Sequence, residues 1–170
     1  MEKQMTRGQT GLTLVELLVA IAVLAVLLTL AVPSFQELRQ QYQVRSAGMV
    51  VYSDLQLARS EAIKRNRAVT VCFSGSGTLD WSYQLLDSAD CSGDVIQSVS
   101  SQYFPSITLT ANYVGTEKKL TFWPRRNTLL AGNVAISKGT QEMRVVTSNV
   151  SGIRTCSNQS LIGVPSPCPS

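Results

Sequence analysis

The sequence Gly11-Leu12-Thr13-Leu14-Val15-Glu16 leads directly into twenty residues, 17–36, that carry no charge and are mostly Leu, Val, Ala and Ile. A helix of that length spans about 30 Å, roughly the thickness of the hydrocarbon layer of a bilayer. An ordinary secretory signal has a shorter apolar core that ends beside small residues. The pattern therefore predicts a membrane-spanning helix over residues 12–33, preceded by a short polar segment, 1–11.

Helical periodicity continues beyond this segment to about Arg65, past Pro33, where the loss of one backbone hydrogen bond can kink a helix. Polar residues such as Asp54 and Arg59 alternate with apolar ones at helical spacing. We therefore expect an amphipathic second half of the helix, 34–66, that packs against the rest of the chain. The apolar stripe consists of Phe35, Leu38, Tyr42, Met49, Tyr52, Leu55, Ala58 and Ala62.

After Asn66 the apolar residues alternate with period two, which is typical of strands. Clusters of Gly, Ser, Asn and Pro separate the candidate strands. One long helix followed by several short strands predicts an α+β fold, in which the helix packs on an antiparallel sheet formed by residues 67–156. The proline-containing segment 157–170 is predicted to be a loop. The candidate strands are residues 68–73, 81–86, 107–113, 120–123, 134–137 and 143–147.

The chain has four cysteines and no histidine. Scattered cysteines without a CxxC pair do not have the spacing of a zinc site, and we expect no metal or other cofactor. Without histidine, Ser-His-Asp and Cys-His catalysis are excluded, and we expect no enzymatic activity. Two disulfides in an oxidising compartment explain the cysteines better. We favour the local pairs Cys72–Cys91 and Cys156–Cys168, each joining a strand end to a nearby loop, while crossed pairings remain open.

The segment from Gly11 to Glu16 resembles the class III leader of type IV prepilins and pseudopilins. The resemblance implies that a prepilin peptidase cuts between Gly11 and Leu12 and that the new N-terminus, Leu12, is then methylated. Leu12 departs from the family pattern, in which Phe or Met is more usual. Glu16 and Pro33 stand at hallmark positions of the family, with roles in assembly.

The position of the Glu16 carboxylate at the edge of an apolar helix also has a physical explanation. Charged groups in membrane segments are costly, about 2.5–3.5 kcal/mol at the bilayer centre, and those present usually mark function. The α-amino group of a neighbouring subunit can compensate Glu16 inside a filament and set the axial register of the helices. The partners expected for this segment are therefore other pilins.

The sequence Leu57-Ala58-Arg59-Ser60-Glu61-Ala62-Ile63-Lys64-Arg65, followed by Val69, resembles the end of the long helix in minor pilins and pseudopilins of the FimT/GspH type. The resemblance implies a minor pilin that enters or primes a type IV pilus, a filament of adhesion, twitching motility and DNA uptake. Such a subunit is a single-pass protein of the inner membrane with its β domain in the periplasm, and later part of the pilus at the cell surface. A minor pseudopilin of a type II secretion system is an alternative.

A further alternative is a minor pilin that binds DNA for natural transformation, as relatives of the FimT kind do. Relatives carry Gly-Arg-x-Arg near the C-terminus, of which this chain keeps one arginine, Arg154. The net charge of +4 is too weak a bias to indicate nucleic acid by itself. We expect any contacts with DNA to come from loops and the C-terminal region, with Trp123 able to stack on an unpaired base. The candidate contacts are Arg154, Arg125, Arg126, Lys118 and Lys119.

Overall fold

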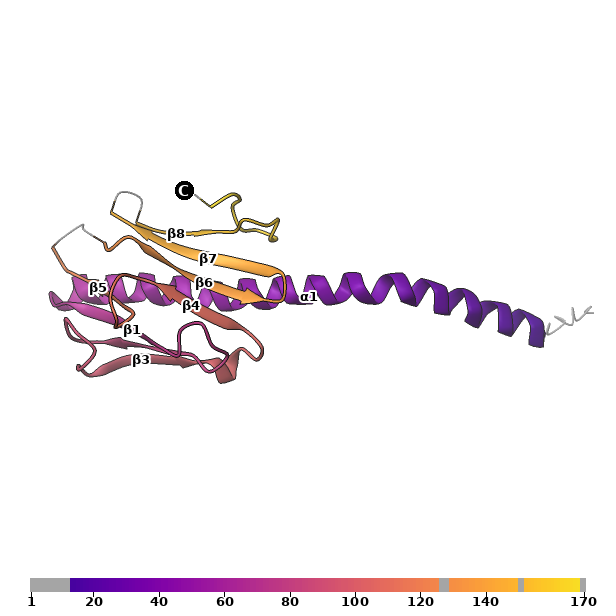
Figure 1. The fold of residues 1–170 in the computed structure, drawn as a ribbon, viewed down its shortest axis with the longest axis horizontal. Coiled ribbons are helices and arrows are strands. Elements are labelled where there is room, and N and C mark those ends of the chain that lie inside the picture. Colours follow the sequence, from indigo (N-terminus) through magenta and orange to yellow (C-terminus); the bar gives the residue numbers. More distant parts are fainter. Residues whose placement is uncertain (1–12, 126–128, 150–151, 169–170) are drawn as a thin grey trace, which may run out of the picture. The chain divides into compact units, whose positions relative to one another are not determined.

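The computed structural model describes residues 13–125, 129–149 and 152–168. Within these ranges the chain forms one long helix, α1 (Leu14–Arg65), a short 3-10 helix, η1 (Ser101–Tyr103), and eight strands (Figure 1). The chain divides into two compact units, Met1–Leu38 and Arg39–Ser170, and α1 contributes to both. The helix ends because Asn66 adopts a left-handed conformation (φ 53°), which asparagine tolerates better than most residues.

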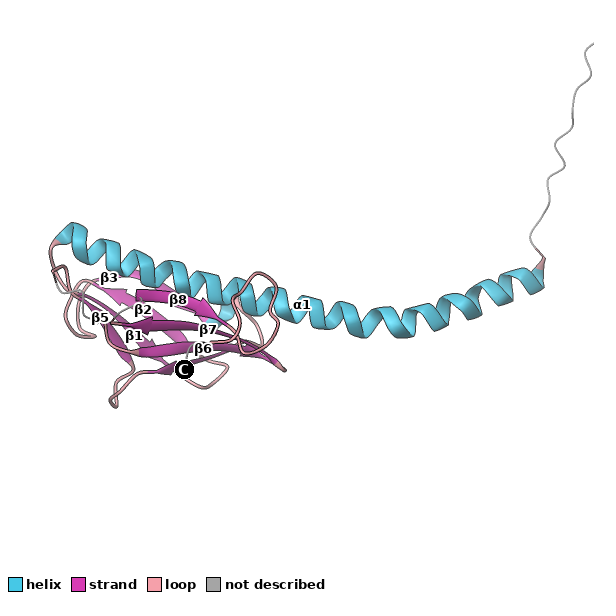
Figure 2. Cartoon of the chain, turned by 90° about the horizontal axis from the view of Figure 1, so that it is seen from above, coloured by secondary structure: helices cyan, strands magenta, loops and turns pink. Residues whose placement is uncertain are grey.

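The strands of the second unit form two antiparallel sheets of four strands each (Figures 1 and 2). The α+β fold with a long helix on antiparallel strands is thus confirmed, but with two sheets where the sequence suggested one. An alternating pattern predicts a strand but not the strand with which it pairs. Here β4 pairs with β6 and β5 pairs with β1, which separates the strands into two sheets. The first sheet has the order β3 (Val95–Ser100), β2 (Ser82–Leu86), β1 (Val69–Ser74), β5 (Lys119–Phe122); the second has the order β4 (Thr108–Asn112), β6 (Gly132–Lys138), β7 (Gln141–Ser148), β8 (Gly152–Cys156).

Two of these strands, β3 and β8, are absent from the sequence-based strand list. Each is an edge strand with a neighbour on one side only. In β3 only Val99 is buried, so its burial does not follow the period of two that a half-buried strand shows. The other two edge strands, β4 and β5, were predicted, so an edge position alone does not hide a strand from sequence analysis.

The second half of α1 covers the core with one face (Figure 2). Gly48 lies directly under Met143 of β7, so that an added methyl group would clash with its sulfur, while Asp54 bonds to Tyr83 of β2. The helix therefore contacts both sheets. Each fully buried Val or Leu on this face contributes about 1.5–3 kcal/mol to folding. The buried apolar residues of the face are Val44, Ala47, Val51, Leu55, Ala58 and Ala62.

The sequence-based stripe is correct for Leu55, Ala58 and Ala62 but wrong for Tyr42 and Met49. Their side chains are 52% and 43% exposed. Two apolar stripes run along this helix, and periodicity alone did not tell which one the sheets would cover. The exposed stripe includes the uncharged residues Tyr42, Met49 and Ile63, so other molecules can pack against it.

Candidate functional site

The first turn of α1 begins with an N-cap hydrogen bond, which is one half of a capping box. The backbone N–H of Glu16 donates to the hydroxyl oxygen of Thr13 at 3.2 Å, and Thr13 stands immediately before the helix. In a capping box, Ser or Thr precedes the helix and Glu or Gln follows three residues later, where the positive end of the helix dipole favours a carboxylate. Thr13-x-x-Glu16 was readable in the sequence, but only the assembly role of Glu16 was inferred from it.

The first half of α1 is apolar on all sides. Its described side chains are exposed around the whole circumference within the chain, for example Leu14 at 74% and Leu24 at 54%. A helix that is apolar all round needs lipid or other helices around it. In length and composition α1 is able to cross a membrane, and Pro33 lies inside it without ending it. Gly11 and Leu12, the predicted processing residues, lie outside the described residues.

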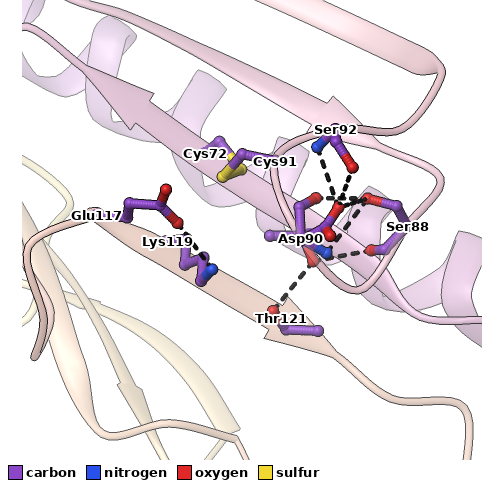
Figure 3. The surroundings of a disulfide bond; sticks show 9 residues. Cys72, Ser88, Asp90, Cys91, Ser92, Glu117, Lys119 and Thr121 are labelled. Atoms are coloured by element: carbon purple, nitrogen blue, oxygen red, sulfur yellow. Dashed lines mark hydrogen bonds and ion pairs between the residues drawn. A yellow bond between two sulfur atoms is a disulfide. The ribbon is translucent and has the colours of Figure 1, made fainter.

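Both disulfides favoured by the sequence are present. Cys72–Cys91 joins β1 to the loop between β2 and β3 (Figure 3), and Cys156–Cys168 joins the end of β8 to the C-terminal segment. In the first loop the Asp90 carboxylate accepts hydrogen bonds from Ser88 and Ser92, which hold its pKa below the ordinary value. The loop is thus fixed both covalently and by its own side chains.

The predicted cationic contacts are not brought together. Lys118 donates to the carbonyl oxygens of Tyr113 and Gly115 at 3.0 and 3.1 Å, so its ammonium stabilises a turn. Lys119 pairs with Glu117 at 2.9 Å (Figure 3). Arg125 is exposed, while Arg126 lies outside the described residues. These lysines therefore serve mainly local structure.

Arg154 lies beside a groove along the edge strand β8. The groove has a volume of about 550 Å³ and is bounded by Tyr52 of α1 and by the disulfide-bonded C-terminal segment. Arg154 is exposed, and β8 pairs with β7 only, so one of its edges is open to this groove. The lining residues are Tyr52, Ile153, Arg154, Thr155, Cys156, Pro165, Pro167 and Cys168.

Two arginines of α1 lie beside glycines that are close in sequence to the lining residues of this groove. Arg45 lies against Gly163, since a methyl group placed there would be 2.9 Å from its Nη2 atom, and Arg59 lies 3.5 Å from the same position on Gly152. Arg45, Tyr52 and Arg59 are seven residues apart, so they lie on one face of the helix. The sequence analysis missed this arrangement because the spacing alone does not reveal which strand the face meets.

Residues 47–152 match the family model described as type II transport protein GspH, which covers more than half of the chain. This chain belongs to the GspH family. Residues 6–32 match the prokaryotic N-terminal methylation motif, a segment that contains Gly11, Leu12 and Glu16. The GspH family chain thus carries a class III prepilin leader, as the sequence predicted. No curated protein matches the sequence.

Solved structures support the fold of this GspH family member. Two crystal structures of the type IV minor pilin FimU of Pseudomonas aeruginosa resemble it with TM-scores of 0.50 and 0.52, each at 20% sequence identity. The matches cover 65% and 66% of this chain, and 90% and 87% of the FimU chains. At that identity the likeness concerns the fold, which is the type IV pilin fold. The chain is therefore a membrane-anchored minor pilin or pseudopilin of the FimT/GspH type.

Proposed function

We propose that this chain is a minor subunit of a type IV pilus that helps to prime or complete the filament and has no catalytic role. The observation that carries the proposal is the helix that is apolar all round in its first half and amphipathic in its second. Such a helix is stable in a bilayer and equally stable among other helices of its kind. The solved structures that it resembles in fold are of a pilus subunit, whereas the family model that it matches is named for type II transport, so the experiment below decides between a pilus and a secretion pseudopilus.

In this proposal the β domain lies in the periplasm before assembly. Both disulfides are in this domain, and the bacterial periplasm is an oxidising compartment. A prepilin peptidase removes residues 1–11 at the inner membrane, and the filament then carries the domain to the cell surface. Glu16, at the first turn, pairs with the α-amino group of a neighbouring subunit, which compensates its charge away from water.

The test is deletion of the gene in its own host, with complementation by the full chain. We expect fewer surface pili and recovery of the subunit in sheared filaments, with secretion of type II substrates unchanged. Normal piliation together with a secretion defect would assign the chain to a secretion pseudopilus and contradict the proposal.

The groove beside β8 favours a second candidate function, binding of DNA. Arg154 of β8 and the aromatic residue Tyr52 line it, while Arg45 and Arg59 of α1 lie beside Gly163 and Gly152, glycines close in sequence to its lining residues. A basic groove with an aromatic side chain suits a single strand, because the guanidinium groups meet phosphates and the ring stacks on a base. This site differs from the expected one, since two of the three arginines come from the helix.

A shift assay on the full chain in nanodiscs of a zwitterionic lipid tests this candidate. Arg154→Ala and Arg45→Ala should each weaken binding of a single-stranded oligonucleotide. Each should also reduce the slope of log affinity against log salt concentration by about one, the value for one lost phosphate contact. Lys64→Ala removes an equal charge from the exposed end of α1 and serves as the control. Equal effects of all three substitutions would indicate a diffuse positive surface instead of a site.

A further inference from the structure

A second groove opens at the end of β5, on the outer side of the first sheet. It has a volume of about 740 Å³, within the usual size of small-molecule sites. Strand β5, the turn before it and the residues that lead into β6 form its walls. Nothing in the minor-pilin function described above uses this groove. Among its lining residues are Val114, Thr116, Trp123, Leu129, Leu130 and Asn149.

Trp123 is one of the residues that line this groove. It is 46% exposed, whereas the other tryptophan, Trp81, is 1% exposed and donates from its indole nitrogen to the carbonyl oxygen of Ile107 at 2.8 Å. Trp81 is thus satisfied in the core, while Trp123 keeps a large apolar face in contact with water. Burying such a face against an apolar surface is favourable, and tryptophan adds a polar N–H at its edge.

The charges in the groove neutralise each other. The Lys119 ammonium and the Glu117 carboxylate are 2.9 Å apart, and this contact raises the pKa of Lys119 (Figure 3). Among the described lining residues, Lys119 and Glu117 are the charged ones, and their charges cancel, so this lining has no net charge to attract a phosphate or a carboxylate. A neutral ligand suits it better than an anionic one.

The remaining lining combines apolar and polar side chains. Leu129, Leu130 and Val114 are aliphatic, with Val114 85% exposed and Leu130 46% exposed. Thr116 and Asn149 add a hydroxyl and an amide that both donate and accept hydrogen bonds. The groove therefore suits a molecule with flat C–H faces and hydrogen-bonding edges.

Hexoses whose hydroxyl groups are equatorial have this character, because their axial C–H bonds make both faces of the ring apolar while the hydroxyls surround the rim. We propose that the groove at the end of β5 binds a neutral oligosaccharide of such hexoses, with one sugar ring stacked on Trp123 and its hydroxyls bonded to Thr116 and Asn149. An unpaired base also has flat faces, but among the described residues that line the groove the one cation, Lys119, is paired with Glu117 and is not free to hold a phosphate.

The experiment measures binding of cellotriose and of triacetylchitotriose to the full chain in zwitterionic nanodiscs, by tryptophan fluorescence and calorimetry. Because Trp81 is buried, a change in emission reports on Trp123. We expect millimolar or tighter binding, a loss of about tenfold or more in affinity in Trp123→Ala, and a smaller loss in Trp123→Phe. Tyr103→Ala, which removes another exposed aromatic ring (67% exposed), should leave binding unchanged.

Three results would overturn the proposal. The first is that neither sugar binds at millimolar concentration to a folded protein with normal circular dichroism. The second is that both sugars bind Trp123→Ala as tightly as the wild type. The third is that a poly-dT oligonucleotide binds through Trp123 while the sugars do not. The last result would assign the groove to bases. Since Trp123 is half exposed, its replacement should leave the fold intact, and the circular dichroism of each variant verifies this.

Discussion

Tyr83 on β2 donates a 2.6 Å hydrogen bond from its hydroxyl group to Oδ2 of Asp54 on α1. Gln97 on the edge strand β3 donates to the other carboxylate oxygen at 2.8 Å. Asp54 is only 5% exposed, and its carboxylate thereby fixes the second half of α1 to the first sheet at one place in the core. The sequence analysis had counted Asp54 among the polar residues between apolar ones, and its burial is a correction.

Tyr83→Phe should destabilise the domain by about 1.5–3 kcal/mol, because a buried carboxylate then loses one of its two donors. Asp54→Asn is the matched control: its amide can accept from Tyr83 and donate to Gln97 after a rotation of the Gln97 amide, so we expect a smaller change. Urea unfolding of a soluble fragment that begins at Ser34 measures both. Equal loss of stability in the two variants would mean that the charge of Asp54 contributes as much as the hydrogen bond from Tyr83.

Stability should also depend on pH through Asp54. Burial raises the pKa of Asp54, and the hydrogen bonds from Tyr83 and Gln97 offset only part of this. The folded chain therefore binds a proton at pH values where the unfolded chain, with a pKa of about 3.9, does not. The contribution of Asp54 to the free energy of unfolding then falls as pH rises through this window, so acidification from pH 7 increases the stability that this one group contributes.

Comparison with Asp54→Asn isolates this effect, because the acids whose pKa is lowered, Glu61 and Asp90, are present in both proteins. The difference in unfolding free energy between wild type and Asp54→Asn, followed from pH 7 to pH 4, should shift in favour of the wild type. A difference that does not vary with pH would contradict a raised pKa of Asp54 in the folded state.

The fragment from Ser34 should contain no free thiol after expression in the periplasm. Cys156→Ser together with Cys168→Ser should lower its stability by about 3 kcal/mol in the chain-entropy model, since the bridge spans 12 residues. The C-terminal segment should then become more sensitive to proteolysis than the sheets. Thiol counting and urea unfolding measure both, and unchanged stability in the double variant would show that the bridge does not stabilise the fold.

Sequence analysis worked best where one local pattern carries the information. The residues from Gly11 to Glu16 and the uncharged run behind them predicted the helix and the family, and the local cysteine pairs appear in the structure as favoured. It failed where distant residues decide. Asp54 is satisfied by Tyr83 and Gln97, which are 29 and 43 residues away in the chain, and no local pattern points to either.

The candidate binding residues show the same division. Arg154 could be singled out from a family pattern, but its neighbour in the groove, Tyr52, comes from the helix and depends on how α1 meets β8. Lys118 and Lys119 looked available in the sequence, and the structure shows both engaged with nearby atoms. Charge in a sequence does not tell whether a cation already has a partner.

Processing should cut the chain between Gly11 and Leu12. Co-expression with a prepilin peptidase should yield an N-terminus at Leu12 by mass spectrometry, and Gly11→Val should block the cut, because the peptidase site must fit a residue without a side chain. Gly8→Val, which alters another glycine of the same leader, is the control and should be processed. An intact residue 1 in assembled material would refute leader removal.

The central claim, that this chain enters a filament through the charge of Glu16, is tested most directly by Glu16→Gln. Glutamine also serves at this position of a capping box, so the substitution keeps the start of α1 and removes only the negative charge. Quantitative mass spectrometry of sheared pili should find the wild-type subunit and lack the Gln variant, although both are present in the inner membrane in equal amounts. Equal amounts of the two in sheared pili would contradict the account and leave Glu16 with a helix-capping role alone.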